Sequence, residues 1–571
     1  MGGGSQGAGA GGGAPRAWSL HASRLALGAR NPIREIVDRL REAKPPEGKG
    51  TWRAPFHLPR WRRWWRCRHR RLPRAADTFH AAARAVVIPL SQGDPTAFPG
   101  LGPPPEARKV RSARGHATFE ALRVACFATR PRPRARAPLA PVLPLQQPFF
   151  APRCRLVAGV LTRARRGSLV LGCPVGTLLA CSARSQALAD VVLDSTADGY
   201  AESSGTLAAR RAVSERFSLP GEAPLADDEV IITVGCSQAL QMCLTALTDG
   251  ERSAVLLPRP CFPLYHTICD FIGAEAVYYD LEPSNGWQAD LTSLEEALRA
   301  LGDRAAAVMV NNPGNPTGSV YSAEHLRSLC AVCEAARVPI IADEVYAGMA
   351  FAGKEAFTPV AAVRGGCPVL SVGALSKLWL APGWRLGWLT VHDAGSVLRD
   401  AQIVLALQRM AQITIGTAHP VQAALSRIFS DTPDTFYSDT TKLLAERAKL
   451  CATRVASLAS KAMRVTTQPQ GAMYLFLKLE DKFMAASGIE DDREFCQRLL
   501  SEEGIVLLPG AAFNMPGYVR VVVCAPTEKL NEAFDRIDAW ALGAANMGCV
   551  GDAAAPVAVT PPALAHHSSR A

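Results

Sequence analysis

The sequence predicts an α/β protein whose larger part is a mostly parallel β-sheet covered by helices on both faces. From about Leu188 onward, short apolar runs typical of buried strands alternate with helical patterns. In order, these runs are VIITV, SAVLL, AAAVMV, VPIIADE and PVLSVG. After about Leu398 the pattern changes to a helical stretch, QIVLALQRMAQITIG, followed by strands around MYLFLKL and YVRVVVC. A second, smaller α+β domain is therefore expected.

The composition is typical of a folded protein. The chain has 571 residues, of which 48% are hydrophobic and 20% charged, so it can build two or three packed cores. No apolar run reaches the roughly 20 residues that a membrane-spanning helix needs, and one of the longest, residues 167–181, is broken by Pro174. Sixteen cysteines are scattered along the chain without a secretory pattern at its start, which favours a reducing, cytoplasmic location.

The positive charge is concentrated near the N-terminus. Residues 51–84 hold ten Arg and one Asp, and residues 108–184 hold fifteen Arg or Lys and one Glu. Together these stretches carry +23, and because the whole chain carries +12, the remainder carries −11. The mildly acidic remainder gives no reason to expect an anionic partner, so the net charge alone does not predict a nucleic-acid-binding protein.

Changes in composition divide the chain into expected segments. These are a disordered tail at 1–30, an N-terminal arm at 31–50 and 86–107, basic insertions expected to be disordered at 51–85 and 108–187, a large domain at 188–398, a small domain at 399–545 and a disordered tail at 546–571. Residues 31–43 have the apolar spacing of a short amphipathic helix. The first acidic residue is Glu35, a weak resemblance to an organellar transit peptide, although a disordered basic tail explains it equally well.

The two basic insertions allow three interpretations. They are surface insertions, which are tolerable because loop-closure entropy grows slowly with length. Alternatively, they come from a mistaken gene reading such as retained introns. In the third interpretation they form a nucleic-acid-binding arm, because Arg beside Trp can contact phosphate and stack on bases.

Polar residues follow several predicted strands, where ligands collect in α/β sheets. After VIITV, Gly235 allows a tight turn into a helix, and Cys236 and Ser237 would present backbone amides and a hydroxyl to a phosphate. That pattern alone is weak, because Ser237 is equally suited to cap the helix. After AAAVMV, a turn rich in Pro and Gly brings three amide side chains into the same crevice: Asn311, Asn312 and Asn315.

The next two strands end in ionisable groups. Asp343 closes VPIIAD, where a half-buried carboxylate needs a cationic partner such as a protonated pyridine nitrogen. Lys377 follows PVLSVG among small and apolar neighbours, which disfavour the charged amine and leave it nucleophilic toward an aldehyde. Arg385, eight residues later, is a candidate phosphate anchor. By contrast, Cys330 and Cys333 lack further ligands nearby and fit a core helix better than a metal site, and no metal is expected.

These motifs together resemble the fold-type I aminotransferases, which depend on pyridoxal 5'-phosphate (PLP), and among them the tyrosine aminotransferase group. The segments that carry the resemblance are TVGCSQAL, PRPCFPLY, NNPGNPTGSVYS, ADEVYAGMAF, LSKLWLAPGWRLGW and PQGAMYLF. Their occurrence in this order is highly specific, whereas each piece alone is not. The resemblance covers 188–545 continuously, with 31–43 and 86–103 in addition.

The resemblance implies roles around the cofactor ring. Lys377 is implied to form a Schiff base with PLP and then to move the proton at the substrate Cα. Asp343 is implied to keep the pyridine nitrogen protonated, so that the ring acts as an electron sink. Tyr346 and Asn315 are implied to hydrogen-bond the 3-oxygen of the ring, and Phe262 to stack on its face.

The resemblance also implies phosphate contacts and an assembly. Cys236, Ser237 and Arg385 are implied to hold the phosphate, joined by Tyr200 of the partner subunit, so a homodimer is expected. One departure from the family pattern lies three residues before the lysine, where Ala374 replaces the usual Gly or Ser and a serine hydroxyl to the phosphate is absent.

For the substrate, the resemblance implies two contacts. Arg520, in the apolar strand YVRVVV, is implied to bind the α-carboxylate in a bidentate fork, and a guanidinium flanked by valines independently suggests an anion. Gly93, in QGDPT, is implied to let the N-terminal segment close over the substrate. The second basic insertion separates this segment from YAESSG, which the family joins through one short helical stretch.

The expected reaction is transfer of the amino group of tyrosine, or a related aromatic amino acid, to 2-oxoglutarate. The products would be 4-hydroxyphenylpyruvate and glutamate. Alternatives are a C–S lyase, a nicotianamine-type or broad-specificity aminotransferase, which share the cofactor chemistry, and a non-catalytic nucleic-acid-binding protein.

Overall fold

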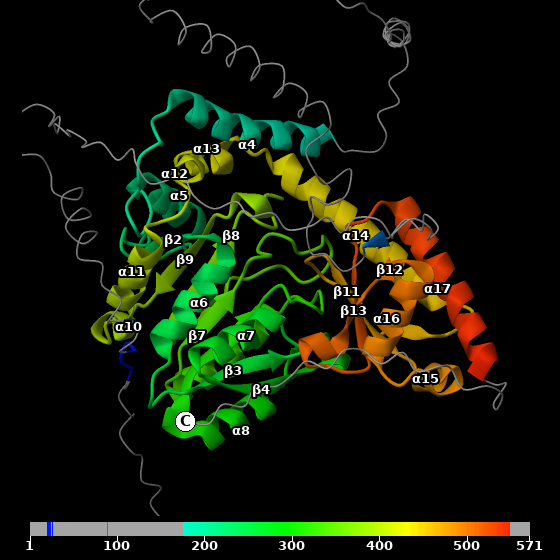
Figure 1. Cartoon of the computed structure of the whole chain (residues 1–571). Coiled ribbons are helices and arrows are strands. Elements are labelled where there is room, and N and C mark those ends of the chain that lie inside the picture. The colour runs from blue at the N-terminus through cyan, green and yellow to red at the C-terminus, as the bar shows by residue number, and fades with distance from the viewer. Residues whose placement is uncertain (1–19, 24–25, 27–87, 90–174, 549–571) are drawn as a thin grey trace, which may run out of the picture.

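The computed structural model describes residues 20–23, 26, 88–89 and 175–548. Its larger part is an eight-stranded sheet with helices on both faces (Figure 1). The strand order is β2 (Val230–Thr233), β9 (Gly387–His392), β8 (Val369–Ala374), β7 (Ile340–Asp343), β6 (Ala305–Asn311), β3 (Ala254–Arg259), β4 (Glu275–Glu282) and β5 (Gln288–Ala289). Neighbours from β8 to β4 are parallel, and β9 is antiparallel to both of its neighbours. The expected mostly parallel sheet is confirmed.

The central strands are buried on both faces, which explains why they are continuous apolar runs. Along β6, Ala307 and Met309 join the core under α6 (Gly235–Leu247), α7 (Pro263–Ile272) and α11 (Ile403–Thr414). The alternate residues, Val308 and Val310, join the core under α8 (Leu291–Leu301) and α9 (Ala323–Ala336). Side chains two residues apart share a face of the sheet, so one strand serves both cores.

The C-terminal part is a smaller α+β domain, as expected. Its four antiparallel strands are ordered β10 (Met463–Val465), β11 (Tyr474–Leu479), β14 (Tyr518–Val522) and β13 (Leu508–Pro509). The helices beside this sheet are α15 (Asp481–Ser487), α16 (Asp492–Glu503) and α17 (Thr527–Gly548). A short parallel pairing joins β1 (Ile88–Pro89), from the expected N-terminal arm, to β12 (Ile505–Val506).

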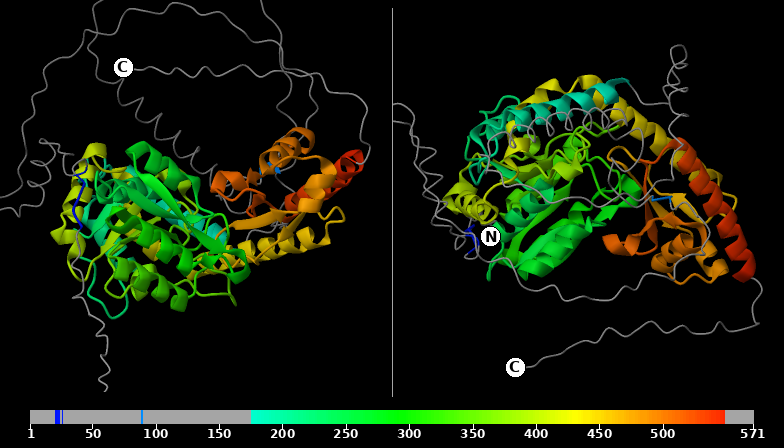
Figure 2. Two further views of the ribbon diagram at one scale, coloured as in Figure 1. Left: turned by 90° about the horizontal axis from the view of Figure 1, so that it is seen from below. Right: turned by 45° about the horizontal axis from the view of Figure 1, so that its top comes forward.

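The expected boundary between the two domains at Leu398 is too early. Helices α10 (Val397–Asp400), α11, α12 (His419–Ala423) and α13 (Leu425–Asp431) still lie with the large sheet, because their apolar faces cover it or α5 (Leu207–Phe217). The transition instead occurs along α14 (Asp434–Ser457), which packs against α4 (Val175–Asp194) and also against α17, β10 and β11. Figures 1 and 2 show this helix running from one part of the molecule to the other.

The expected disordered segments need two further corrections. Helix α4 (Val175–Asp194) begins inside the stretch 108–187, and it contacts α12, α13 and α14. Within the expected tail 1–30, the amide nitrogen of Ala22 donates to the carbonyl of Ala401 at 2.8 Å, and Ala22 and Ala26 are buried beside α6 and α11. The 31–43 helix, the insertion 51–85 and most of 86–174 lie outside the described residues, as does the tail beyond residue 548.

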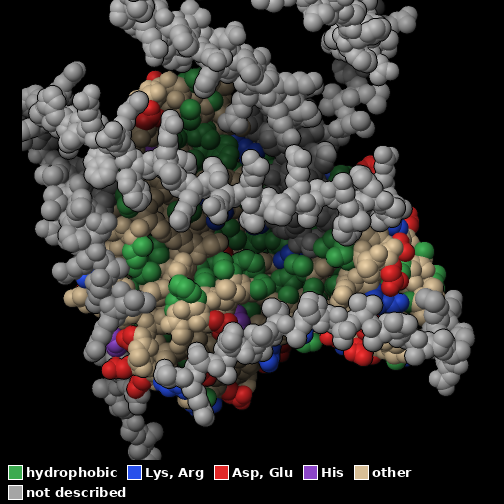
Figure 3. Space-filling model, in the orientation of Figure 1, with side chains coloured by type: hydrophobic (Ala, Val, Ile, Leu, Met, Phe, Trp, Pro, Cys, Tyr) green, Lys and Arg blue, Asp and Glu red, His purple; other side chains and the backbone are tan. Residues whose placement is uncertain are grey.

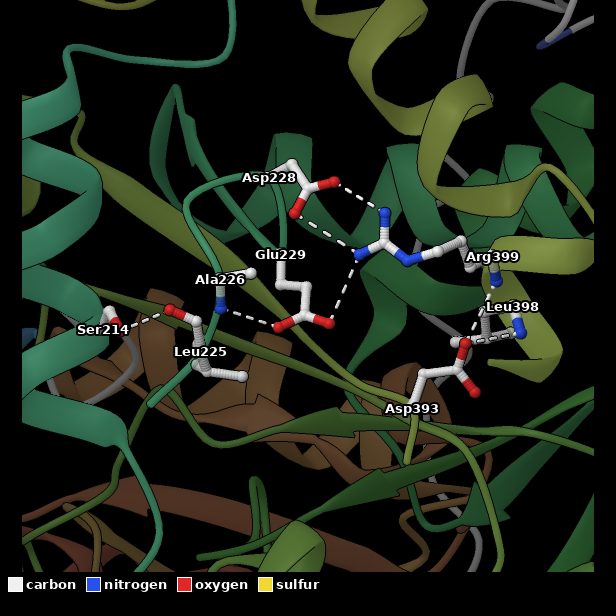
Figure 4. A network of polar contacts seen from close by, with 8 residues as sticks. All are labelled: Ser214, Leu225, Ala226, Asp228, Glu229, Asp393, Leu398 and Arg399. Carbon is white, nitrogen blue, oxygen red and sulfur yellow. Dashed lines mark hydrogen bonds and ion pairs between the residues drawn. The ribbon is translucent and has the colours of Figure 1, made fainter. Parts of the chain in front are cut away.

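Helix α10 is fixed to the loop before β2 by a charged network (Figure 4). Arg399 donates two hydrogen bonds to the Asp228 carboxylate, at 2.6 and 3.3 Å, and contacts Glu229 at 3.4 Å. Asp393 accepts from the backbone amides of Leu398 and Arg399, at 2.7 and 3.0 Å, and so caps the helix. The network therefore joins the edge strand β2 to the helices that follow β9.

Short 3₁₀ helices complete the described elements. The 3₁₀ helices are η1 (Pro283–Asn285), η2 (Gly302–Arg304), η3 (Val360–Val363), η4 (Pro382–Trp384) and η5 (Gly510–Phe513). In Figure 3, hydrophobic side chains gather in the middle of the visible face, and charged side chains gather nearer its edges. No helix among the described residues is long and apolar enough to cross a membrane.

Candidate active site

A cavity of about 310 Å³ lies beyond the carboxyl ends of the parallel strands. Nine of the eleven predicted site residues line it: Cys236, Ser237, Phe262, Asn315, Asp343, Tyr346, Lys377, Arg385 and Arg520. They come from seven segments between residues 236 and 520, so folding brings together side chains that are far apart in the sequence.

Two predicted residues are not among those that line this cavity. Tyr200 precedes α5 and is 73% exposed, and its implied role belongs to the partner subunit. Gly93 lies outside the described residues.

One end of the cavity is called the ring end here, because the resemblance implies that the cofactor ring lies there. It is built around Asp343, which is 3% exposed. Its carboxylate accepts hydrogen bonds from the Tyr265 hydroxyl at 2.6 Å and from the Val345 amide at 3.2 Å. The thiol of Cys236 also lies 3.6 Å from the carboxylate. The pKa of Asp343 is raised, because the effect of burial outweighs the opposing effects of these hydrogen bonds and the nearby Lys377 amine. A carboxylate held in this way is suited to pair with a cation entering the cavity.

The backbone of Asp343 is held by the turn after β6. Its carbonyl accepts from the amide side chain of Asn311 at 3.0 Å and from the Asn312 backbone amide at 3.1 Å. The expectation that all three asparagines offer amides to the crevice is therefore wrong for Asn312. It is fully buried, and its side-chain oxygen accepts from the Tyr321 backbone amide at 3.0 Å. The structure instead uses Asn311 and Asn312 to position the aspartate.

Above the ring end, two phenols and an amide form a linked group. The hydroxyls of Tyr346 and Tyr474 lie 2.6 Å apart, and burial raises the pKa of Tyr346 well above its usual value. Arg520 donates to the side-chain oxygen of Asn315 at 2.8 Å. The amine of Lys377 lies 5.8 Å from the centre of the Tyr346 ring. The amine, the phenol and the amide thus face one space.

Arg520 itself is held between aromatic rings. Its guanidinium carbon lies 4.5 Å from the centre of the Tyr474 ring and 4.9 Å from that of Phe513, and the side chain is 5% exposed. Strand pairing explains the first contact. Arg520 is opposite Phe476, and Tyr474, two residues away, lies on the same face. A buried guanidinium with restricted rotation is suited to bind a carboxylate in a fixed orientation.

The opposite end of the cavity is shaped for an anion. Helix α6 begins at Gly235, and no side chain caps it, so amides of its first turn remain available there. Gly235 has φ +71°, and a Cβ on it would come within 2.6 Å of the Arg385 guanidinium. Arg385 donates to the carbonyl oxygens of Pro382 at 3.1 Å and Val234 at 3.3 Å, and its side chain is exposed. This end is open, whereas the ring end is enclosed.

Three further polar residues line the cavity without a role predicted from the sequence: Tyr265, Ser376 and Tyr474. Tyr265 and Tyr474 both lie in motifs that carried the resemblance, PRPCFPLY and PQGAMYLF, which was the available signal. Ser376 places a side chain beside Lys377 in the cavity.

A second cavity, of about 340 Å³, adjoins the first, and Val345 lines both. Glu344 follows Asp343 directly and lines this second cavity, together with Ser371, Trp379 and Trp388. One oxygen of Glu344 accepts from the Val360 amide at 2.7 Å. Burial raises the pKa of Glu344 to about 7. The adjacent carboxyl groups of Asp343 and Glu344 therefore line different cavities.

The predicted core helix containing the CxxC sequence is confirmed. Cys330 and Cys333 are both buried on α9, where they pack with Leu326 and Leu329 in the core. They act there as small apolar side chains.

Comparison with known proteins agrees with the fold. The profile of the family "Aminotransferase class I and II" matches residues 176–537. Mouse tyrosine aminotransferase is 38% identical over 376 residues, which cover 65% of this chain and 79% of the mouse protein. Nicotianamine aminotransferase B of Hordeum vulgare is 33% identical over 342 residues, 60% of each chain. The crystal structure of tyrosine aminotransferase from Leishmania infantum is similar with a TM-score of 0.58 at 32% identity, and the match covers 63% of this chain and 87% of that one.

The chain therefore belongs to the aminotransferase class I and II family, and its fold is the fold-type I architecture predicted from the sequence. Within that family it is similar to tyrosine aminotransferases of animals and of Leishmania.

Proposed function

We propose that this enzyme uses PLP to transfer the amino group of tyrosine, or of a related aromatic amino acid, to 2-oxoglutarate, with 4-hydroxyphenylpyruvate and glutamate as products. The substrate assignment is supported by the 38% identity to mouse and human tyrosine aminotransferase. The observation that carries the proposal is the convergence of Lys377, Asp343 and Arg520 on one cavity.

The described residues fit PLP in orientation as well as in chemistry. Asp343, at the enclosed end, suits a protonated pyridine nitrogen, because a buried carboxylate needs a cation nearby. At the open end, the space that a Cβ on Gly235 would fill lies against Arg385, beside the amides of α6, and suits the phosphate. Cys236 and Ser237 lie on the first turn of that helix, and Phe262 lines the wall where the ring would stack.

When bound, PLP supplies an electron-withdrawing ring that stabilises negative charge at the substrate Cα. Lys377 then removes and returns the proton at that carbon, since its amine faces the same space as Tyr346. Tyr346 and Asn315 orient the ring through its 3-oxygen. Arg520 binds the substrate carboxylate and fixes the Cα in front of the lysine.

We propose that the working form is a homodimer in which Tyr200 of the partner subunit completes the phosphate end. Thr417 donates to the Arg385 carbonyl at 3.2 Å, and the imidazole of His419 lies 2.8 Å from the carbonyl of Gly199, so the segment before α5 lies beside this end. Several large apolar side chains nearby in sequence are exposed: Tyr200 73%, Leu207 39%, Ile413 67% and Ile415 38%. Burial of such side chains favours association of two copies.

The location proposed is the cytoplasm. The ten cysteines from Cys236 to Cys524 are all free thiols, nine of them buried. A chain rich in free thiols is suited to a reducing compartment.

The decisive experiment measures products and cofactor together. Addition of PLP to the purified protein should produce a visible absorption band that K377A lacks, and tyrosine with 2-oxoglutarate should yield glutamate. Pyruvate and ammonia, formed instead from a cysteine-type substrate, would favour the C–S lyase alternative. Faster turnover of nicotianamine than of tyrosine would favour a nicotianamine aminotransferase, to which the similarity with the Hordeum vulgare enzyme gives weight.

A further inference from the structure

Tyr474 connects two parts of the site that the proposed function uses separately. Its ring lies under the Arg520 guanidinium, at 4.5 Å, and its hydroxyl lies 2.6 Å from that of Tyr346. The side chain is 2% exposed and lines the cavity. One residue thus contacts both the group that binds the substrate carboxylate and the phenol beside the cofactor.

The geometry holds Tyr474 in this double contact. The rings of Tyr346 and Tyr474 meet edge to face, with centres 5.7 Å apart and planes at 82°. Phe513 covers the guanidinium at 4.9 Å, so Arg520 cannot leave the Tyr474 ring without losing both aromatic contacts. The backbone is fixed as well, because Tyr474 pairs with Val522 in the sheet.

Either phenol could donate in the hydrogen bond between Tyr346 and Tyr474, and the guanidinium over the Tyr474 ring favours donation from Tyr474. A cation over an aromatic ring draws electron density from it and makes its hydroxyl a stronger donor. Burial raises the pKa of Tyr346 well above its usual value, so this phenol keeps its proton. If the Tyr474 hydroxyl donates to the Tyr346 oxygen, the Tyr346 proton remains available to an acceptor in the cavity.

We propose that Tyr474 is a positioning residue that couples the charge of Arg520 to the hydrogen bond that Tyr346 donates to the cofactor. The inference rests on the proposed function. It adds that binding of the substrate carboxylate to Arg520 changes the proton affinity of the cofactor through Tyr474 and Tyr346. Before substrate binds, the positive charge of Arg520 strengthens the donation from Tyr474 to Tyr346. A substrate carboxylate neutralises that charge and weakens the donation, so the cofactor retains a proton more readily once substrate is bound.

The test is a spectroscopic pH titration of the PLP-loaded dimer, with and without 3-phenylpropionate, a carboxylate that has no amino group to transfer. The wild-type enzyme should show a visible band with a midpoint pH that rises when 3-phenylpropionate binds. Tyr474→Phe keeps the ring under Arg520 but removes the hydroxyl. Its midpoint without ligand should rise by about 0.5 to 1 pH unit, roughly three- to tenfold in proton affinity, as expected for loss of one hydrogen bond. The further rise caused by 3-phenylpropionate should be smaller than in the wild type.

Tyr279→Phe is the matched control. The Tyr279 hydroxyl is equally buried and donates one hydrogen bond, to the carbonyl of Met309 at 2.7 Å, but it is not among the residues lining the cavity. This variant should titrate like the wild type. If Tyr474→Phe also titrates like the wild type, with and without ligand, the coupling is disproved.

A second measurement applies if Tyr474→Phe binds PLP too weakly for the titration. The dissociation constant of PLP is measured for Tyr346→Phe, Tyr474→Phe and the double variant. Coupling predicts that the double variant loses less affinity than the two single losses combined, and additive losses would disprove it. Absence of any PLP absorption in the wild-type enzyme would instead disprove the proposed function, so the two failures are distinguishable.

Discussion

The two ends of the cavity differ in how completely one chain builds them. At the ring end, Asp343 is 3% exposed and accepts hydrogen bonds from Tyr265 and Val345. At the phosphate end, Arg385 is exposed and donates to two backbone carbonyls. One chain therefore arranges the groups that the proposed function assigns to the cofactor ring. The groups that it assigns to the phosphate lie at the open end, where the proposed second copy would complete them.

The largest loss is expected from Lys377→Ala, at the centre of the cavity. This variant lacks the base that moves the Cα proton, so kcat should fall by roughly 10²- to 10⁴-fold or more. Steady-state formation of glutamate from tyrosine and 2-oxoglutarate measures it. Turnover at the wild-type rate would show that another group carries the proton.

The next largest loss is expected at the enclosed end, from Asp343→Asn. The neutral amide keeps the shape but cannot balance a positive charge on the ring, so kcat should fall by roughly 10²- to 10³-fold. Tyr265→Phe, which removes one hydrogen bond to the same carboxylate, should have a smaller effect. Equal kcat values for wild type and Asp343→Asn would contradict the assignment of the ring end.

Arg520→Lys tests the proposed binding of the substrate carboxylate by Arg520. Lysine keeps the charge but loses the two-pronged hydrogen bond and the aromatic stacking, so kcat/KM for tyrosine should fall by roughly 10- to 100-fold. PLP affinity should change little in comparison. A loss confined to PLP binding would place Arg520 outside the substrate site.

Tyr200→Phe tests the open end. Removal of one neutral hydrogen bond to the phosphate should weaken PLP binding by roughly 2- to 10-fold. Sedimentation should show the same dimer for both proteins. An unchanged PLP dissociation constant would remove Tyr200 of the partner subunit from the phosphate site.

The smallest effect on turnover is expected from Glu344→Gln, directly beside the enclosed end but in the other cavity. The pKa of Glu344 is raised to about 7, above its unfolded value, so the folded protein holds this proton more tightly than the unfolded chain. The stability of the wild type should therefore decrease as the pH rises from about 4.5 to about 7, by on the order of 3 kcal/mol. Thermal unfolding of Glu344→Gln should lack this part of the pH dependence, while kcat changes less than about twofold. Parallel pH profiles for the two proteins would contradict the raised pKa.

Local patterns predicted the large sheet and the residues that follow its strands, whereas Tyr346 and Phe262 were predicted only from the family resemblance. Asp343 and Lys377 were predicted from their places after apolar strands, and parallel strands bring such ends together. Tyr265 and Tyr474 were assigned no role because their partners, Asp343 and Tyr346, are 78 and 128 residues away. Pairings over such distances leave no periodic signal in one sequence.

The boundaries were harder to predict than the strands. Helix α11 was expected as a helix, but its amphipathic pattern does not say which sheet it covers, and the structure places it against α6 of the large domain. Likewise, Ala22 and Ala26 follow a Gly-rich start and carry almost no hydrophobic signal, yet they are buried beside α6 and α11. Small side chains dock because they fit, which composition alone does not reveal.

The continuity of α14 joins the small domain, which carries Arg520, to the large domain. A helix of 24 residues is about 36 Å long, so a pivot of about 5° at one end would displace the other by about 3 Å. Because one end packs against α4 and the helix also packs against β10 and β11, a small change of angle at α4 would shift the sheet that carries Arg520 by about the length of one hydrogen bond.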